Sequence, residues 1–195
     1  MGADLHDIRY VRIGSEDLDE SVRFATEILG LELMERDRSA AYLRGDDRDH
    51  NICYVEGRGS GTMTGWEVGS MAALDRAAAE FEAARVQVRA GTSEEREQRR
   101  VRGLLVLNDP SGNTIELVAR PQACGRRYFP ARDAGITSFS HVGLHTRDAP
   151  ADEAFWVANL GAKVSDWIGD AALIRINEVH HNVALFPSTK SGVQH

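Results

Sequence analysis

Residues 141–185 read HVGLHTRDAPADEAFWVANLGAKVSDWIGDAALIRINEVHHNVAL, and residues 10–54 read YVRIGSEDLDESVRFATEILGLELMERDRSAAYLRGDDRDHNICY. When the two stretches are aligned without a gap, at an offset of 131 residues, ten of the 45 positions are identical. Chance alone gives roughly 6% identity at ordinary residue usage. Asp17 matches Asp148 at the start of an apolar stretch in both copies. An internal repeat of this kind indicates that one supersecondary unit occurs twice.

Each copy predicts a strand, a helix and three further strands. In the first copy Ile8–Ile13 alternates as a strand does, and a helix follows, with Ser15 as its expected N-cap and Gly30 at its end. The remaining predicted elements of this half are strands at Leu31–Glu35, Ala40–Arg44, Asn51–Val55, Trp66–Val68, Leu104–Leu107 and Thr114–Ala119 and a helix at Ala72–Ala84. The charged run at 94–102 predicts an exposed loop or helix end.

The second copy predicts the same order of elements over fewer residues. Its strands are expected at Ser138–Thr146, Ala162–Trp167, Ala171–Asn177 and Asn182–Phe186, and its helix at Ala151–Leu160. The fold class is therefore α+β, with tandem βαβββ modules that form concave mixed sheets. We expect an N-terminal module at 1–120, a linker at 121–135, and the first half of a C-terminal module at 136–195, whose remainder lies beyond the sequence.

Composition limits the function classes. The chain has 195 residues, with 30 Asp and Glu against 23 Lys and Arg and a net charge of −7, which argues against binding to nucleic acid or to an anionic membrane. No apolar run approaches the ~20 residues that span a bilayer. Two cysteines make no disulfide framework, so a reducing cytoplasm is expected.

Three motifs carry a family resemblance. The stretch NDPSGNTIEL at 108–117, at the close of a repeated βαβββ module, resembles the vicinal oxygen chelate superfamily, which has the glyoxalase-like fold. Ser140–Val142, His180–Leu185 and Gly192–His195 resemble the type I extradiol catechol ring-cleavage dioxygenases, such as 2,3-dihydroxybiphenyl dioxygenase. The resemblance implies an oxidoreductase of aromatic catabolism that opens a catechol-type diol with O2 at non-haem Fe(II), or Mn(II) in some members, and that forms homo-oligomers.

The resemblance also assigns residues. His141 and His195 stand where the family has its two histidine metal ligands, and the third ligand, a glutamate, is expected beyond the sequence, near position ~247 by the repeat offset. His181 stands where the family has an acid/base histidine that stabilises the bound oxygen species, a role that imidazole suits because its free pKa is ~6.5. Asn182 is expected to hydrogen-bond either substrate or backbone.

The implied ligand set leaves room on the metal ion for both substrates. Two imidazoles and one carboxylate on one face of an octahedral ion leave positions open for a chelating diol and for dioxygen. In the first copy Glu116 is a carboxylate without such partners, because Tyr10 replaces the first histidine. We therefore interpret Glu116 as a relic or a structural residue.

Two other functions remain open on the same fold. One is a non-enzymatic module that binds small molecules, as drug-resistance proteins do. The other is a glyoxalase-like isomerase or a lyase, which usually uses more than one glutamate and consumes no oxygen. Oxygen uptake with a catechol separates the three.

Overall fold

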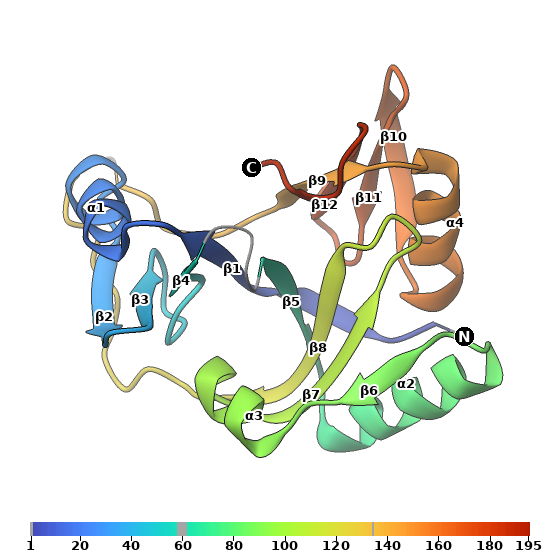
Figure 1. The fold of residues 1–195 in the computed structure, drawn as a ribbon, viewed down its shortest axis with the longest axis horizontal. Coiled ribbons are helices and arrows are strands. Elements are labelled where there is room, and N and C mark those ends of the chain that lie inside the picture. Colours follow the sequence, from blue (N-terminus) through green and yellow to red (C-terminus); the bar gives the residue numbers. More distant parts are fainter. Residues whose placement is uncertain (1, 58–61, 134) are drawn as a thin grey trace. The chain divides into compact units, whose positions relative to one another are not determined.

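The structure is a computed structural model that describes residues 2–57, 62–133 and 135–195 (Figure 1). The chain forms two compact units. Unit 1 comprises the N-terminal residues up to Ile8, Gly65–Pro121 and Ser140–His195, and unit 2 comprises Arg9–Thr64 and Gln122–Phe139. The predicted modules at 1–120 and 136–195 follow the repeat rather than these units, and their boundaries stay a prediction.

Unit 2 is built on one βαβββ arrangement. Its strands are β1 (Leu5–Ser15, whose first residues lie in unit 1), β2 (Glu32–Arg36), β3 (Ala40–Arg44) and β4 (Ile52–Glu56), in the order β2-β3-β4-β1. Helix α1 (Leu18–Arg23) continues directly into a π-helical turn, η1 (Phe24–Ile28). Ala25 and Leu31 pack there against Leu43 of β3. Burying this apolar face is what holds the helix on the sheet.

The N-cap of α1 differs from the prediction. Asp17, rather than Ser15, accepts the backbone N–H of Glu20 in the first turn. Ser15 is buried and is hydrogen-bonded through its hydroxyl to Ser21. The helix therefore begins two residues later than expected, because the aspartate offers a charged acceptor to the free N–H groups.

Unit 1 contains strands from both halves of the chain. The first half supplies β5 (Met63–Val68, whose first two residues lie in unit 2), α2 (Met71–Ala83), β6 (Val88–Ala90), α3 (Ser93–Arg99), β7 (Val101–Asn108) and β8 (Thr114–Pro121), with the strands in the order β5-β8-β7-β6. The second half supplies β9 (Val142–Thr146), α4 (Ala149–Asn159), β10 (Lys163–Ile168), β11 (Ala171–Arg175), β12 (Val183–Pro187) and β13 (Gly192–Val193), with the strands in the order β10-β11-β12-β9-β13. The rings of Trp66 and Trp156, both fully buried, meet edge to face at 5.2 Å between centroids.

The repeat is visible in strand register. The parallel pair β1–β4 aligns Val11 with Ile52, and the parallel pair β9–β12 aligns Val142 with Val183, each shifted by 131 residues. The irregularity in β2, after Leu33, recurs in β10 at the same offset. The predicted α+β fold with repeated βαβββ modules and mixed sheets is therefore confirmed.

One helix and two short strands were not predicted from the sequence. The charged run predicted as a loop or helix end contains α3, and the short strands β6 and β13 were not predicted. Thr92 and Glu95 form a reciprocal capping box that starts α3, and a Thr-x-x-Glu spacing is a sequence signal for it. Strands of two or three residues carry too little alternation to be recognised. Among the described residues, no helix is long and apolar enough to cross a membrane.

Candidate metal and catalytic site

Sheet topology brings three histidines to one edge. His141 directly precedes β9, and His181 lies two residues before β12; these neighbouring strands are parallel, so both histidines lie at the same edge of the sheet. Strand β13 runs antiparallel to β9, so the residues that follow it return to that edge. His195 is held there by backbone hydrogen bonds, since its carbonyl oxygen accepts from the Gly143 N–H at 2.8 Å.

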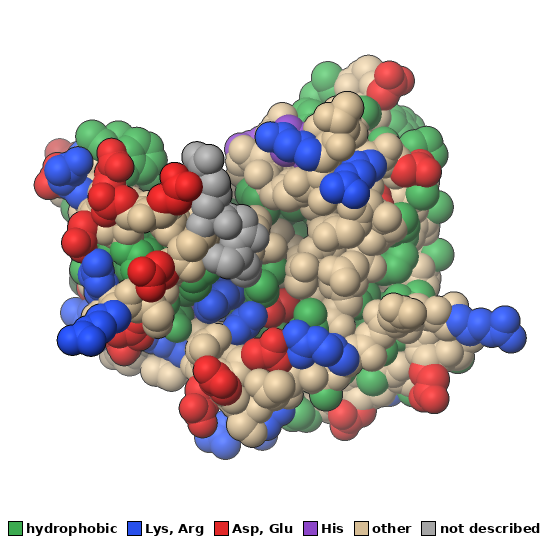
Figure 2. Space-filling model, viewed as in Figure 1, with side chains coloured by type: hydrophobic (Ala, Val, Ile, Leu, Met, Phe, Trp, Pro, Cys, Tyr) green, Lys and Arg blue, Asp and Glu red, His purple; other side chains and the backbone are tan. Residues whose placement is uncertain are grey.

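The three imidazole rings lie close together. The Nε2 atoms of His141 and His195 are 3.2 Å apart, and the ring centroids of His141 and His181 are 4.7 Å apart. His195 is exposed, and histidine side chains are visible at the surface near the C-terminus (Figure 2). The structure thus brings the three predicted histidines together, while their roles remain predictions.

Gly143 makes room for this arrangement. A Cβ atom on Gly143 would lie 2.4 Å from Cε1 and 2.5 Å from Nδ1 of the His195 ring, closer than real contacts allow. The absence of a side chain two residues after His141 therefore lets the His195 ring lie against β9. The role of Gly143 was not predicted from the sequence, although a glycine inside a strand is a known sign of a close approach.

The environment favours neutral imidazoles. Burial lowers the pKa of His141 below its usual value, and the nearby rings of His181 and His195 lower it further. Burial also lowers the pKa of His181, with His180 and His195 adding to the effect. A neutral imidazole keeps the lone pair that a metal ion needs, so the lowered pKa of His141 favours the form that can coordinate.

The donor set fits part of a metal site. Two ligands ~2.1 Å from one ion and at right angles lie about 3.0 Å apart, close to the observed separation of the His141 and His195 Nε2 atoms. Within the described part of the chain, no group of three or more His, Cys, Asp or Glu side chains is placed to hold a metal ion. The structure therefore places two imidazole nitrogens at a spacing that suits two ligands of one ion, and the predicted glutamate is not among the described residues.

Asn182 serves the backbone. It is 1% exposed, its Oδ1 accepts from the Ile176 N–H at 3.0 Å, and its Nδ2 lies 3.5 Å from the Ser140 carbonyl oxygen. These bonds agree with the backbone alternative and fix the loop ahead of β12. Contact with substrate stays a prediction.

Glu116 forms a buried ion pair. Nε and Nη2 of Arg99 donate to Oε1 of Glu116 at 3.0 and 2.8 Å, and the Glu116 side chain is fully buried. A guanidinium therefore balances the carboxylate that stands near the close of the first module. This agrees with the structural interpretation of Glu116.

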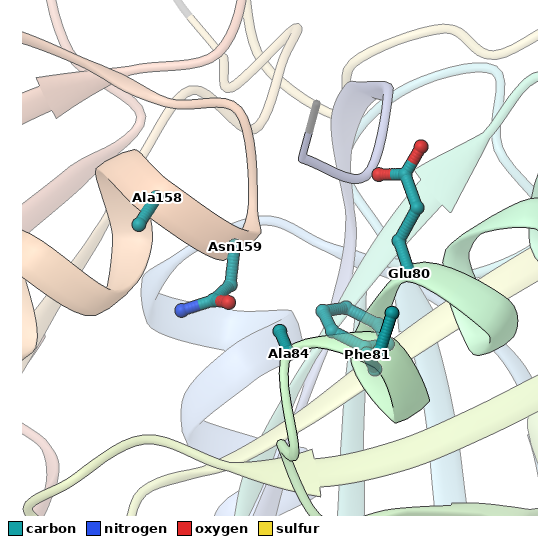
Figure 3. Close-up of a pocket in the computed structure, with 6 residues that line it drawn as sticks. Glu80, Phe81, Ala84, Ala158 and Asn159 are labelled. Carbon is teal, nitrogen blue, oxygen red and sulfur yellow. The ribbon is translucent and has the colours of Figure 1, made fainter.

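A pocket of about 350 Å³ lies elsewhere in unit 1. Its lining comes from the C-terminal ends of α2 and α4 (Figure 3). The lining residues are Glu80, Phe81, Ala83, Ala84, Ala158 and Asn159. It contains none of the predicted site residues, so the histidine edge remains the candidate site.

Comparison with known proteins places the chain in a family. The Glyoxalase/Bleomycin resistance protein/Dioxygenase superfamily matches residues 7–117. An iron-dependent extradiol dioxygenase of Rhodococcus jostii (strain RHA1) is 30% identical over 98% of this chain and 71% of its own length. The chain belongs to the extradiol dioxygenases of this superfamily.

Other extradiol dioxygenases resemble the chain over a smaller share of their length. The biphenyl-2,3-diol 1,2-dioxygenase of Sphingomonas paucimobilis is 29% identical over 77% of this chain, which spans about half of that protein (53%). Among solved structures, a halotolerant catechol dioxygenase shares the fold, with a TM-score of 0.86, 24% identity, and coverage of 100% of this chain and 70% of its own. A Mn(II)-bound glyoxalase from Novosphingobium aromaticivorans gives 0.81 at 25% identity, covering 98% of this chain and 64% of its own.

Proposed function

We propose that the protein opens the ring of a catechol-type aromatic diol beside its hydroxyl groups, with O2 and a non-haem Fe(II) ion. The main support for the proposal is the distance between the Nε2 atoms of His141 and His195, which lie 3.2 Å apart at one edge of the sheet formed by β9 to β13. Family membership supports the reaction type, because relatives of the chain are extradiol dioxygenases.

The three histidines take different roles in this proposal. His141 and His195 bind the metal as neutral imidazoles, and a donor set of this kind also suits Mn(II). A bound ion would supply the redox chemistry that lets the diol react with O2. His181, whose ring lies 4.7 Å from that of His141, holds or delivers a proton at the edge of the site.

The carboxylate ligand affects the design of the test. Since the predicted glutamate is not among the described residues, we expect the 195-residue chain to bind Fe(II) weakly. Added acetate supplies a carboxylate in solution and should strengthen binding. Tight one-to-one binding without acetate would contradict this expectation.

The decisive experiment measures oxygen uptake after anaerobic loading with excess Fe(II). Catechol and 2,3-dihydroxybiphenyl should each be tried, with and without acetate. We expect uptake that requires the diol and rises with acetate, together with a coloured ring-opened product. The variants His141→Ala and His195→Ala should lose it.

His6→Ala is the matched control, because His6 is an exposed histidine that pairs with Asp4. No diol-dependent uptake under any of these conditions would overturn the proposal. Diol binding that chelators do not affect would favour a binding module, and isomerisation without oxygen uptake would favour the glyoxalase-like alternative.

Two further properties belong to this proposal. We place the protein in the cytoplasm, a location in keeping with Cys53 and Cys124, whose side chains are thiols rather than halves of a disulfide. We also expect a homo-oligomer. The exposed side chains of Phe24 and Ile28, 50% and 60% accessible, contribute to a hydrophobic surface over α1 and η1 (Figure 2) and support self-association.

A further inference from the structure

His195 depends on a very short strand. Strand β13 has two residues, paired as Gly192 with His145 and Val193 with Leu144 of β9. A two-residue strand on the outside of a sheet has little stability of its own, and the residues next to it convert readily between ordered and disordered states. A histidine held within about 3 Å of its partner ring therefore needs a further anchor.

Asn113 supplies that anchor. It belongs to the turn between β7 and β8, it is 5% exposed, and it bridges the two strands at their first paired position. Its Oδ1 accepts the Gly192 N–H at 2.6 Å, and its Nδ2 donates to the His145 carbonyl oxygen at 3.1 Å. One side-chain amide from the first half of the chain thus joins β13 to β9.

Asp109 fixes the orientation of this amide. Its carboxylate accepts from the Asn113 backbone N–H at 2.7 Å and from the Asn113 Nδ2 at 2.8 Å. Both hydrogens of Nδ2 are then used, one by Asp109 and one by the His145 carbonyl, so the oxygen of the amide can only face the Gly192 N–H. If the Asn113 amide were flipped, its NH2 group would face the Gly192 N–H, which is also a donor.

The turn has a second attachment that is independent of Asn113. The Ser111 backbone N–H donates to Oδ1 of the buried Asp152 in α4 at 2.9 Å, and the Ser111 hydroxyl is bonded to Thr146 and accepts from the Arg147 N–H. The turn is therefore held at the start of α4 whatever occupies position 113, so a substitution there removes the bridge without releasing the turn.

We propose that Asn113, oriented by Asp109, is a positioning residue that holds β13 against β9 and so places His195 beside His141. The inference rests on the proposed function, because it concerns the placement of a predicted metal ligand. It also gives the NDPSGN turn of the first module a role at the histidine cluster of the sheet formed by β9 to β13. Comparison of the two copies of the repeat does not predict this role.

The test compares three variants with the wild-type protein. Asn113→Ala removes the bridge. Asp109→Asn combined with Asn113→Asp exchanges the two groups, which restores an acceptor for the Gly192 N–H but leaves the His145 carbonyl oxygen without its donor. Asn108→Ala is the matched control, since Asn108 is the exposed last residue of β7, directly before the same turn, and its side chain accepts from the Thr114 hydroxyl rather than contacting β9 or β13.

Two measurements are made on each variant: amide hydrogen exchange at Gly192 and Val193 by NMR, and affinity for Co(II) by titration of its visible absorption. For Asn113→Ala we expect exchange at Gly192 to rise at least tenfold, with β7 and β8 unchanged, and Co(II) affinity to fall by about tenfold, as for partners that orient a metal ligand. The exchanged pair should recover at most part of the protection at Gly192, because its bond to the His145 carbonyl is still missing, and Asn108→Ala should change neither the exchange nor the Co(II) affinity.

Two results would decide against the inference: Gly192 exchange within twofold of wild type in Asn113→Ala, or equal acceleration throughout unit 1. Failure of the proposed function has a different signature. If the wild-type protein binds no Co(II) but Gly192 loses protection and the His141–His195 ring contact is lost in Asn113→Ala, then the positioning role stands and the metal role fails.

Discussion

Gly143 shows how much the candidate site depends on one missing side chain. The position of His141 could be predicted from sequence, because its motif lies on the opening strand of the second copy. The need for a glycine at position 143 could not be predicted from sequence. It arises because β13 pairs antiparallel with β9 and the His195 ring then lies against the backbone of β9. Only the folded register brings residues 143 and 195 together.

Gly143→Ala should therefore displace the His195 ring and leave the fold intact. The colliding atoms belong to a surface side chain that can move, so we expect the unfolding temperature to stay within a few degrees and Co(II) affinity to fall about tenfold. Gly125→Ala is the control, because a Cβ there meets nothing within 4 Å. Unchanged affinity and an unchanged His195 ring signal in Gly143→Ala would refute this reading.

The Arg99–Glu116 pair makes a second prediction at the residue scale. Both side chains are buried and bonded to each other, so removing one charge takes the directly paired opposite charge away from the other. Glu116→Gln should lower the free energy of unfolding by roughly 3 kcal/mol in urea denaturation, whereas Arg99→Met combined with Glu116→Leu should recover most of the loss. A single variant as stable as the wild type would show that the pair is not needed.

At the scale of elements, prediction succeeded where apolar alternation or helical spacing extends over five residues or more. Strand β3 was predicted with its observed bounds, and α2 to within one residue at each end. It failed for α3, whose charged surface residues show no apolar face, and for β13, which is defined by its partner strand and by Asn113. The π-helical turn η1 was also invisible, because it is a local change in backbone bonding within a helical pattern.

Helix α3 offers a pH test. Hydrogen bonds from Arg89, with smaller contributions from the Thr92 N–H, lower the pKa of Glu95 to about 2 from an ordinary 4.5. A carboxyl whose pKa is lower in the folded state stabilises the fold above about pH 4.5, and this contribution disappears as the pH falls through about 2.

Glu95→Gln keeps an acceptor for the capping box and removes the charge. Because Arg89 is about half exposed, we expect a loss below ~1 kcal/mol at pH 7. Chemical denaturation from pH 7 down to pH 2 should show the two proteins converging as the pH falls. A difference that stays constant over this range would mean that the charge of Glu95 does not contribute.

At the scale of the whole chain, the two copies show how a repeat diverges while its geometry persists. Tyr10 and His50 of the first copy correspond to His141 and His181 of the second, and in both copies the two rings lie close, 5.4 and 4.7 Å apart between centroids. The first pair is buried, and His50 is bonded there to Asp49. The alignment predicted the correspondence; burial of the first pair depends on packing that the alignment does not contain.

The edge-to-face contact of Trp66 with Trp156 gives unit 1 a built-in optical reporter. Both indoles are shielded from water, whereas the third tryptophan, Trp167, is 56% exposed. Emission from the shielded pair should shift to longer wavelength, and its near-ultraviolet circular dichroism should vanish, when β5 separates from α4. Local unfolding of unit 1 can thus be followed by intrinsic tryptophan fluorescence without an attached dye. The emission of the exposed Trp167 should stay nearly constant meanwhile.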